Sequence, residues 1–293
     1  MKTSRRDFIK TSALLGGGLA VSESVFAGVG GNTGPTPKIG ICTGIDNCAV
    51  AQNAGYSFLE EGVRGFLVPA EPESVFSPIL EKAMKSPLPV TACNSFLPGN
   101  MKSVGPNPAN EEILSFAETA FKRAKLAGVK IIVFGSGGSR SIPEGFSKEE
   151  GTRQFVELCK KMALLAAKQE VVVVIEPLNT KECNFINSVA EGGEIVRAVN
   201  HRNIRLLADL YHMKMEDEGP ENIIKYGNLL RHVHIAEKEG RSAPGTHGED
   251  FTPYFDALKK VGYKGSISVE CKWQDLATQA PAAFRAITDQ WTI

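Results

Sequence analysis

The sequence predicts a single α/β domain, a (β/α)8 TIM barrel, and three observations support this prediction. Eight short apolar runs alternate with amphipathic segments at intervals of roughly 20 to 40 residues, the pattern of repeated βα units. The chain has 293 residues, and such a barrel takes roughly 250. Long loops follow several of the apolar runs. An open doubly wound sheet is the alternative, but Thr43-Gly44 after the first run lacks the glycine-rich dinucleotide fingerprint.

The apolar runs and the segments between them place the elements. VVVVI at 171–175 is the clearest strand, because four valines and an isoleucine in succession fit a strand buried on both faces. Ala54-Gly55, Ala127-Gly128 and Val261-Gly262 are typical of helix C-caps. We predict strands at 39–43, 58–61, 90–93, 131–134, 171–176, 205–209, 232–235 and 266–270. The clearest helices are expected at 111–126, 148–169, 189–199, 220–226 and 252–261.

The first 27 residues are predicted to be an export signal outside the fold. SRRDFIK at 4–10 resembles a twin-arginine signal, and the apolar run at 13–21 is too short to span a bilayer stably. Val25-Phe26-Ala27 offers a cleavage site. Residues 28–38 are rich in Gly and Pro and are expected to form a flexible linker. The catalytic domain would then be 39–293, exported to the periplasm without a stable membrane anchor.

The charge balance argues against a nucleic-acid partner. The chain has 33 basic and 33 acidic residues, and without residues 1–27 it carries 29 and 31, a net charge of −2. A nucleic-acid-binding domain would be expected to show a basic excess or stripe. The 6 cysteines lack the paired spacing of a metal site and are expected to be mostly buried thiols.

Four predicted strands end in side chains that can bind a metal ion. Glu176, Asp209, His234 and Glu270 are separated by 33, 25 and 36 residues, roughly one βα unit each. Successive strands would therefore direct them to one spot on the barrel axis. Because three carboxylates cannot share a dry cavity without a counter-charge, a divalent cation is expected. Three oxygen donors and one imidazole favour Mn²⁺, Co²⁺ or Mg²⁺, with Zn²⁺ or Fe²⁺ as alternatives.

Other polar residues near the predicted strand ends are candidates for substrate binding, although each also has an ordinary structural explanation. Trp273 could stack on a ligand or simply pack against the fold. His232 lies two residues before His234, so strand alternation directs it inward and one layer deeper, where a supporting role is favoured. The remaining candidates, which could equally be solvated strand ends or loop polars, are Glu60, Asn94, Lys102 and Arg140.

These motifs together resemble a known family. The pattern consists of IEPLN with Glu182 six residues after Glu176, DLYH at 209–212, HVH at 232–234, Arg241 followed by Pro244-Gly245, and VE at 269–270. It resembles the xylose isomerase-like barrel family, and within it the ketose 3-epimerase and hydroxypyruvate isomerase branch, from about residue 39 to the end.

The resemblance implies roles for these residues. It makes Glu176, Asp209, His234 and Glu270 the metal ligands, and Glu176 and Glu270 also the acid/base pair on the two faces of the sugar. It further implies that substrate oxygens are held by His212 and Arg241, and that Glu182 lies near the reacting carbon.

The expected activity is therefore metal-dependent sugar isomerisation or epimerisation. A metal that chelates a carbonyl and its neighbouring hydroxyl stabilises the enediolate left by proton removal, and two glutamates can remove and return that proton. Because export argues against sugar phosphates, an unphosphorylated keto sugar is the expected substrate.

Other activities use the same residues or the same fold. A lyase or hydratase acting on 3-keto-glycosides or their glucal products is the main alternative. An abasic-site endonuclease is disfavoured by the charge and by the presence of only 5 histidines. A non-catalytic sugar-binding module is disfavoured because both glutamates are present. The sequence leaves the oligomeric state open, and a homo-oligomer is one option.

Overall fold

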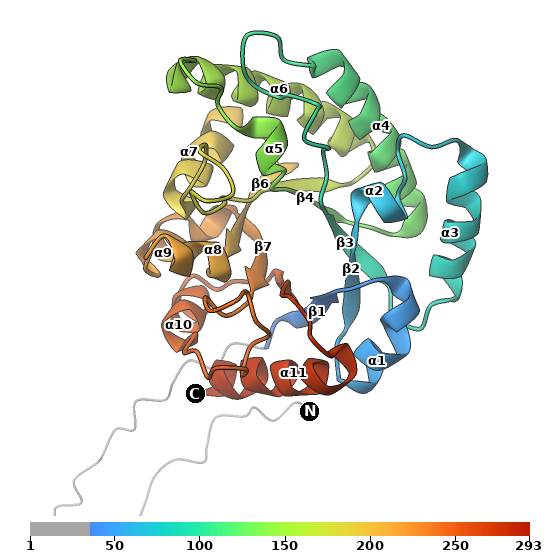
Figure 1. The fold of residues 1–293 in the computed structure, drawn as a ribbon, viewed down its shortest axis with the longest axis vertical. Helices are drawn as coiled ribbons and strands as arrows, with labels where there is room; N and C mark the ends of the chain where they lie inside the picture. Colours follow the sequence, from blue (N-terminus) through green and yellow to red (C-terminus); the bar gives the residue numbers. More distant parts are fainter. Residues whose placement is uncertain (1–35) are drawn as a thin grey trace, which may run out of the picture. The chain divides into compact units, whose positions relative to one another are not determined.

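A computed structural model describes residues 36–293 and shows eight parallel strands closed into a barrel with helices around it (Figure 1). Each strand pairs with its neighbour in the sequence, and β1 pairs with β8 to complete the ring. The predicted TIM barrel is therefore confirmed. The strands are β1 (Lys38–Cys42), β2 (Phe58–Gly62), β3 (Val90–Asn94), β4 (Ile131–Phe134), β5 (Val172–Ile175), β6 (Ile204–Asp209), β7 (Leu230–Ile235) and β8 (Ser266–Val269).

The helices lie outside the strands and cover them from solvent (Figure 1). Five of them match the predicted helices to within one residue at each end: α4 (Asn110–Ala127), α6 (Lys148–Lys168), α7 (Val189–Val199), α9 (Glu221–Tyr226) and α10 (Thr252–Lys260). The others are α1 (Cys48–Asn53), α2 (Val63–Phe66), α3 (Glu73–Lys85), α5 (Gly137–Arg140), α8 (Leu210–Met215) and α11 (Leu276–Thr292).

The two long helices that the sequence analysis did not predict, α3 and α11, each contain a proline. Pro78 and Pro281 lack the backbone N–H that would bond back along the helix, which normally argues against helix in a sequence. Both helices pack an apolar face on the barrel, through Phe76 in α3 and Ile287 and Trp291 in α11. Burial of these side chains therefore outweighs the local cost of the proline.

The predicted helix ends are confirmed at the glycines. Gly55, Gly128 and Gly262 have φ values of +101°, +82° and +64°, the left-handed region in which a residue with a Cβ is strained. Serine side chains define two of the helix starts, because Ser147 accepts from the Glu150 N–H before α6 and Ser188 accepts from the Glu191 N–H before α7.

Strand β5 is buried on both faces, as its valine run predicts. Val173 and Ile175 belong to the large apolar layer between strands and helices. Val174 faces the other way and packs with Val133 and Leu207 in a small second cluster. Alternation along the strand therefore fills both the barrel interior and the surrounding layer.

Some expectations concern residues outside the described range. The predicted export signal at 1–27 and most of the linker at 28–38 lie there, and Lys38 already begins β1. Within residues 36–293, no helix has both the length and the apolar content needed to cross a membrane. All six cysteines are free thiols, four of them buried, in agreement with the sequence analysis.

Close packing between β1 and β2 gives a test of the fold. A Cβ at Gly40 would lie 2.2 Å from the Phe58 ring, whereas a Cβ at Gly65 would meet nothing within 4 Å. We expect Gly40→Ala to lower the free energy of unfolding by about 1 to 3 kcal/mol through overpacking. Gly65→Ala in α2 should be neutral or raise it by less than about 1 kcal/mol. Urea denaturation would measure both, and equal effects would contradict this packing.

Candidate active site

The four strand-end side chains that the sequence analysis singled out converge at the carboxyl end of the barrel. Glu176 follows β5, Asp209 ends β6, His234 lies in β7 and Glu270 follows β8. Each offers a ligand atom, and these atoms all lie within 4.8 Å of one another. Adjacent strands in register produce this convergence, since Asp209 pairs with His234 and His234 with Ser268, two residues before Glu270.

The imidazole of His234 lies among the three carboxylates. Its Nδ1 is 3.1 Å from Glu176 Oε1, 3.3 Å from Glu270 Oε2 and 3.9 Å from Asp209 Oδ2. Glu176, Asp209 and His234 are buried, and the Glu270 side chain is 21% exposed. The cluster is therefore open to solvent mainly on the side of Glu270.

Two buried atoms of this cluster lack hydrogen-bond partners. Asp209 Oδ1 accepts from the N–H groups of Tyr211 and His212 and so caps α8, but Oδ2 has no hydrogen bond. His212 Nε2 is also without a hydrogen bond, 3.5 Å from Asp209 Oδ2. Unsatisfied buried polar atoms are costly, and two of them this close together are available to bind a ligand. Three carboxylates and one imidazole are a donor set that suits a divalent cation.

The charges of the cluster shift its pKa values in opposite directions. Burial raises the pKa of Glu176, and the Glu270 and Asp209 charges reinforce this against the His234 hydrogen bond. Burial would also raise the pKa of Glu270, but the charges of His234 and Arg241 outweigh the effect of burial and hold this pKa at about 2. Burial would lower the pKa of His234, but Glu60 and Glu270 raise it well above the usual value. Without a cation, a proton on His234 partly neutralises the cluster.

Glu60 lies beneath the cluster, contrary to both explanations that the sequence offered. It is neither a solvated strand end nor able to contact substrate, because it is buried with its two oxygens on two histidines. Oε1 accepts from His234 Nε2 at 2.9 Å and Oε2 from His232 Nε2 at 2.8 Å. His232 Nδ1 in turn lies 2.9 Å from Ser266 Oγ. The predicted deeper position of His232 is thus observed, and Glu60 fixes the His234 ring with Nδ1 facing the cluster.

Arg241 extends over the open side of the cluster. Its Nη2 pairs with Glu270 Oε2 and lies 3.7 Å from Asp209 Oδ2, while Nη1 is 3.4 Å from Glu182 Oε1. The guanidinium carbon is 4.7 Å from the centre of the Tyr211 ring. The loop after β7 therefore brings Arg241 to the site together with Glu182 from the loop after β5.

His212 is held in one tautomer by the chain after β5. The Asn179 backbone N–H donates to His212 Nδ1 at 3.2 Å, so in the neutral ring the proton is assigned to Nε2. This Nε2–H is the unpartnered group that faces Asp209. The sequence expectation that His212 faces the substrate site is consistent with this orientation.

The remaining candidates differ in their placement. Asn94 donates to Glu270 Oε1 at 2.8 Å and so orients that carboxylate. Trp273 is half-buried and its indole N–H donates to the Cys42 carbonyl at 3.4 Å, which places it beside the end of β1. Lys102 is exposed, but its ammonium donates to the Gly138 carbonyl at 2.7 Å rather than to the cluster.

Arg140 is not placed to bind substrate, and this expectation is corrected. The side chain is fully buried, and it donates to the carbonyls of Phe134 at 3.0 Å and Ile186 at 3.5 Å. It therefore ties the end of β4 to the loop before α7. In the sequence, a loop arginine near a strand end looks the same whether it faces the ligand or the protein interior.

Sequence reasoning missed two contributors. A Cβ at Gly135 would lie 2.0 Å from Glu176 Oε2, so only glycine leaves room for this carboxylate. Cys42, at the end of β1, forms a second close group with Glu60 and His234, whose ligand atoms lie within 4.8 Å of one another. For Gly135, the available sequence signal was its position directly after a predicted strand. For Cys42 there was none, because nothing in the sequence distinguished it from the other cysteines.

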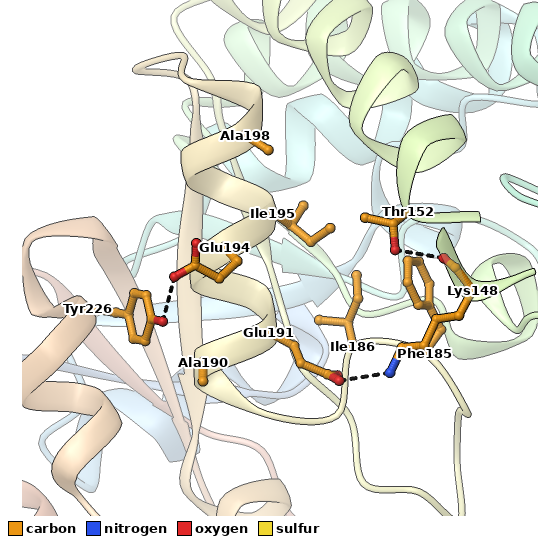
Figure 2. A pocket seen from close by; sticks show the side chains of 10 residues that line it. All are labelled: Lys148, Thr152, Phe185, Ile186, Ala190, Glu191, Glu194, Ile195, Ala198 and Tyr226. Atoms are coloured by element: carbon orange, nitrogen blue, oxygen red, sulfur yellow. Dashed lines mark hydrogen bonds and ion pairs between the residues drawn. The ribbon is translucent and has the colours of Figure 1, made fainter. Parts of the chain in front are cut away.

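An apolar groove lies elsewhere, between α6 and α7 on the outside of the barrel. It has a volume of 540 Å³ and is lined by residues such as Ile186, Ile195 and Tyr226. Figure 2 shows that its polar groups pair with each other: Glu191 contacts Lys148 at 2.8 Å, and Glu194 accepts from the Tyr226 hydroxyl at 2.7 Å. No set of unpaired polar groups converges there, so it is not the candidate active site.

Fold and site together define an α/β-barrel protein with a candidate metal centre at the carboxyl ends of its strands. Residues 48–290 match the family model described as "Xylose isomerase-like TIM barrel", and the chain belongs to this family.

Individual relatives match in part of the sequence or in fold. An L-ribulose 3-epimerase from Methylomonas sp. (strain DH-1) is 33% identical over 127 residues, 43% of this chain and 44% of that protein. The chain thus matches less than half of that relative's length. D-psicose 3-epimerase from Clostridium cellulolyticum H10, solved with D-tagatose, is similar in fold with a TM-score of 0.77 and 21% identity, covering 87% of this chain and 99% of that one. The 3-keto-D-glucoside 4-epimerase from E. coli is also similar in fold, with a TM-score of 0.71 and 22% sequence identity. The match covers 88% of this chain and 100% of that one.

The contacts of Glu60 predict its effect on metal binding. Glu60→Gln removes the negative charge beneath His234 and can accept from only one of the two histidines, so the imidazole becomes a weaker ligand and its ring is held less firmly. We expect the affinity for Mn²⁺ or Co²⁺ to fall by about 10- to 100-fold, measured by isothermal titration calorimetry. Glu218→Gln, which alters an acid that accepts from the Val189 N–H at the start of α7, should leave the affinity unchanged. Unaltered binding by Glu60→Gln would contradict the positioning role.

The raised pKa of His234 predicts that metal binding depends on pH. At neutral pH the metal-free imidazole holds a proton that a cation must displace, and this competition weakens as pH rises toward the His234 pKa. The affinity should therefore increase with pH, by about tenfold per unit if each ion releases one proton. Calorimetry in two buffers of different ionisation enthalpy would count the released protons. An affinity that stays constant from about pH 6 to pH 8 would refute this expectation.

Proposed function

We propose that the protein is a divalent-metal-dependent sugar epimerase or isomerase that moves a proton next to the carbonyl of an unphosphorylated keto sugar. The observation that carries this proposal is the placement of Glu176 and Glu270. They come from the ends of two separate strands, β5 and β8, and lie 3.1 and 3.3 Å from the same His234 nitrogen. One substrate carbon between them would be within reach of both carboxylates.

Each group of the site has a place in this chemistry. A bound divalent cation, held by Glu176, Asp209, His234 and Glu270, would polarise the carbonyl and acidify the neighbouring C–H. One glutamate takes the proton and the other returns it: return to the opposite face of the same carbon is epimerisation, and return to the neighbouring carbon is isomerisation. Asn94 orients Glu270, and the charges of His234 and Arg241 keep it ionised.

Substrate oxygens would be held by groups that already face the cluster. His212 offers its free Nε2–H, and Arg241 offers guanidinium N–H groups. Glu182, 41% exposed and joined to Asn179 and Arg241, could accept a hydrogen bond from a hydroxyl. Because Arg241 is paired with Glu270 and Glu182, its charge is not free for a phosphate. This favours an unphosphorylated sugar.

The comparisons support this class of substrate. The relatives named above are epimerases of L-ribulose, D-psicose and a 3-keto-D-glucoside. We therefore propose a free ketose or a 3-keto-glycoside as substrate, with Mn²⁺, Co²⁺ or Mg²⁺ as the metal. Elimination or hydration of a 3-keto-glycoside would use the same groups, and the experiment below distinguishes it. We also propose that residues 1–27 direct export, as their sequence indicates.

Deuterium exchange tests the proposed reaction. The metal-loaded protein would be incubated in D₂O with free ketoses and with a 3-keto-glucoside. We expect one deuterium per turnover at the carbon next to the carbonyl, and loss of turnover when a chelator removes the metal. Cleavage or hydration of the 3-keto-glucoside without formation of an epimer would contradict the proposed epimerisation and would indicate lyase or hydratase activity instead.

The acid/base pair is tested by substitution. Glu176→Gln and Glu270→Gln should each lower turnover by about 100- to 10,000-fold, because neither amide can accept the proton. Since both residues are also proposed ligands, turnover should be measured at saturating metal with the bound metal quantified. Glu194→Gln on the outside of α7 is the control. Full activity in either active-site variant, or full recovery by added metal, would contradict the proton-transfer role.

A further inference from the structure

Basic side chains gather at the end of the barrel opposite the candidate active site. They lie at the amino ends of the strands and in the connections that lead into them. They line three adjoining hollows of 730, 530 and 190 Å³. Arg231 lines the first two hollows, and Arg202 and Arg205 line the last two, so the three form one continuous surface. We call it the basic face and define it by Lys38, Lys130, Arg202, Arg205, Arg231 and Lys264.

The charges of the basic face are not neutralised within the described part of the chain. None of its six side chains forms an ion pair in residues 36–293, and five of them are exposed, Arg205 being half-buried. The one acid among the residues that line these hollows, Glu170, forms its ion pair with Lys125 at 2.7 Å and is close enough to Lys130 for that charge to lower its pKa as well, so one acid stands against the six cations. The chain without residues 1–27 has a net charge of −2, so this local excess is a segregation of charge that creates a positive potential at one end.

The N-terminal segment joins the barrel at this same face. Thr36 and Pro37, the first described residues, line the largest hollow beside Lys38. The preceding 35 residues are therefore attached at the edge of the basic face. They contain the basic stretch at 4–10 and the apolar run at 13–21. A surface that this apolar run enters is therefore tethered to the edge of the basic face through residues 22–35.

Charge complementarity selects among the occupants of the face. The segment 1–27 carries four basic and two acidic residues, so it would be repelled rather than bound. A second copy joined by a two-fold axis would set like charges against each other. A lipid surface rich in anionic headgroups matches both the cations of the face and the apolar run of the attached segment.

We propose that the basic face docks the folded barrel on an anionic lipid surface while the N-terminal segment engages the same membrane. This proposal depends on the membrane-targeting function proposed for residues 1–27 and is independent of the sugar chemistry. The orientation directs the candidate active site away from the membrane, because that site lies at the other end of the strands. Each cation close to such a surface strengthens binding by about fivefold, and the effect is screened by salt.

Vesicle co-sedimentation of the full-length chain tests the proposal. The vesicles would contain either phosphatidylcholine alone or an equal mixture with phosphatidylglycerol. The test variant is Lys130→Glu/Arg231→Glu/Lys264→Glu. Its matched control, Lys122→Glu/Lys160→Glu/Lys161→Glu, makes the same charge change at exposed positions of α4 and α6.

The expected result is specific to the face and to the lipid. The test variant should lose affinity for phosphatidylglycerol vesicles by on the order of 100-fold or more, and the control by much less. Salt at about 1 M should remove the difference between the two vesicle types for the natural chain. Equal loss in both variants would overturn the proposal in favour of a net-charge effect. Binding of heparin or polyphosphate through the same residues, without preference for anionic vesicles, would overturn it in favour of a soluble polyanion.

Discussion

The crowding of carboxylates around one imidazole is the constraint on which the site depends. Glu176, Asp209 and Glu270 all approach His234 Nδ1 within 3.9 Å in a largely buried place, where their mutual repulsion is poorly screened. A proton on His234 or Glu176, or a divalent cation, must therefore offset this negative charge. A barrel core alone would not select such an arrangement, because apolar residues of similar size would be more stable. The presence of this costly cluster is the physical argument for chemistry at this position.

The layer below the cluster gives that arrangement its rigidity. Glu60, from β2 on the far side of the barrel, accepts from His234 and His232, and His232 reaches Ser266. These hydrogen bonds cross the barrel interior and set the direction of the His234 ring. Gly135 also helps to place a second candidate ligand, because the absence of a Cβ leaves the space that the Glu176 carboxylate occupies. Catalytic groups that must stay in place during proton transfer need such support from neighbours that never touch substrate.

The two ends of the barrel have opposite electrostatic character. Acidic groups converge where the strands end, and cations that form no ion pair within residues 36–293 gather where they begin. In a parallel barrel these ends are separated by the full length of the strands, which is compatible with the substrate binding proposed at one end and the lipid contact proposed at the other. The connections at each end can vary without disturbing the apolar layer between strands and helices, which stabilises the fold.

The sequence by itself determined the barrel, because eight apolar runs and glycine-marked helix ends are local patterns. It also identified the four candidate metal ligands at the strand ends, because they are spaced roughly one βα unit apart. Only the tertiary structure decided the orientation of polar side chains whose neighbours are distant in sequence. Glu60 bonds to histidines 172 and 174 residues away. Arg140 turns inward to backbone carbonyls instead of toward the site. The six cations of the basic face, spread from Lys38 to Lys264, become one surface only when the barrel closes. Local propensity fixes where a strand ends, whereas the contacts of the side chain at its end depend on the strands that close around it.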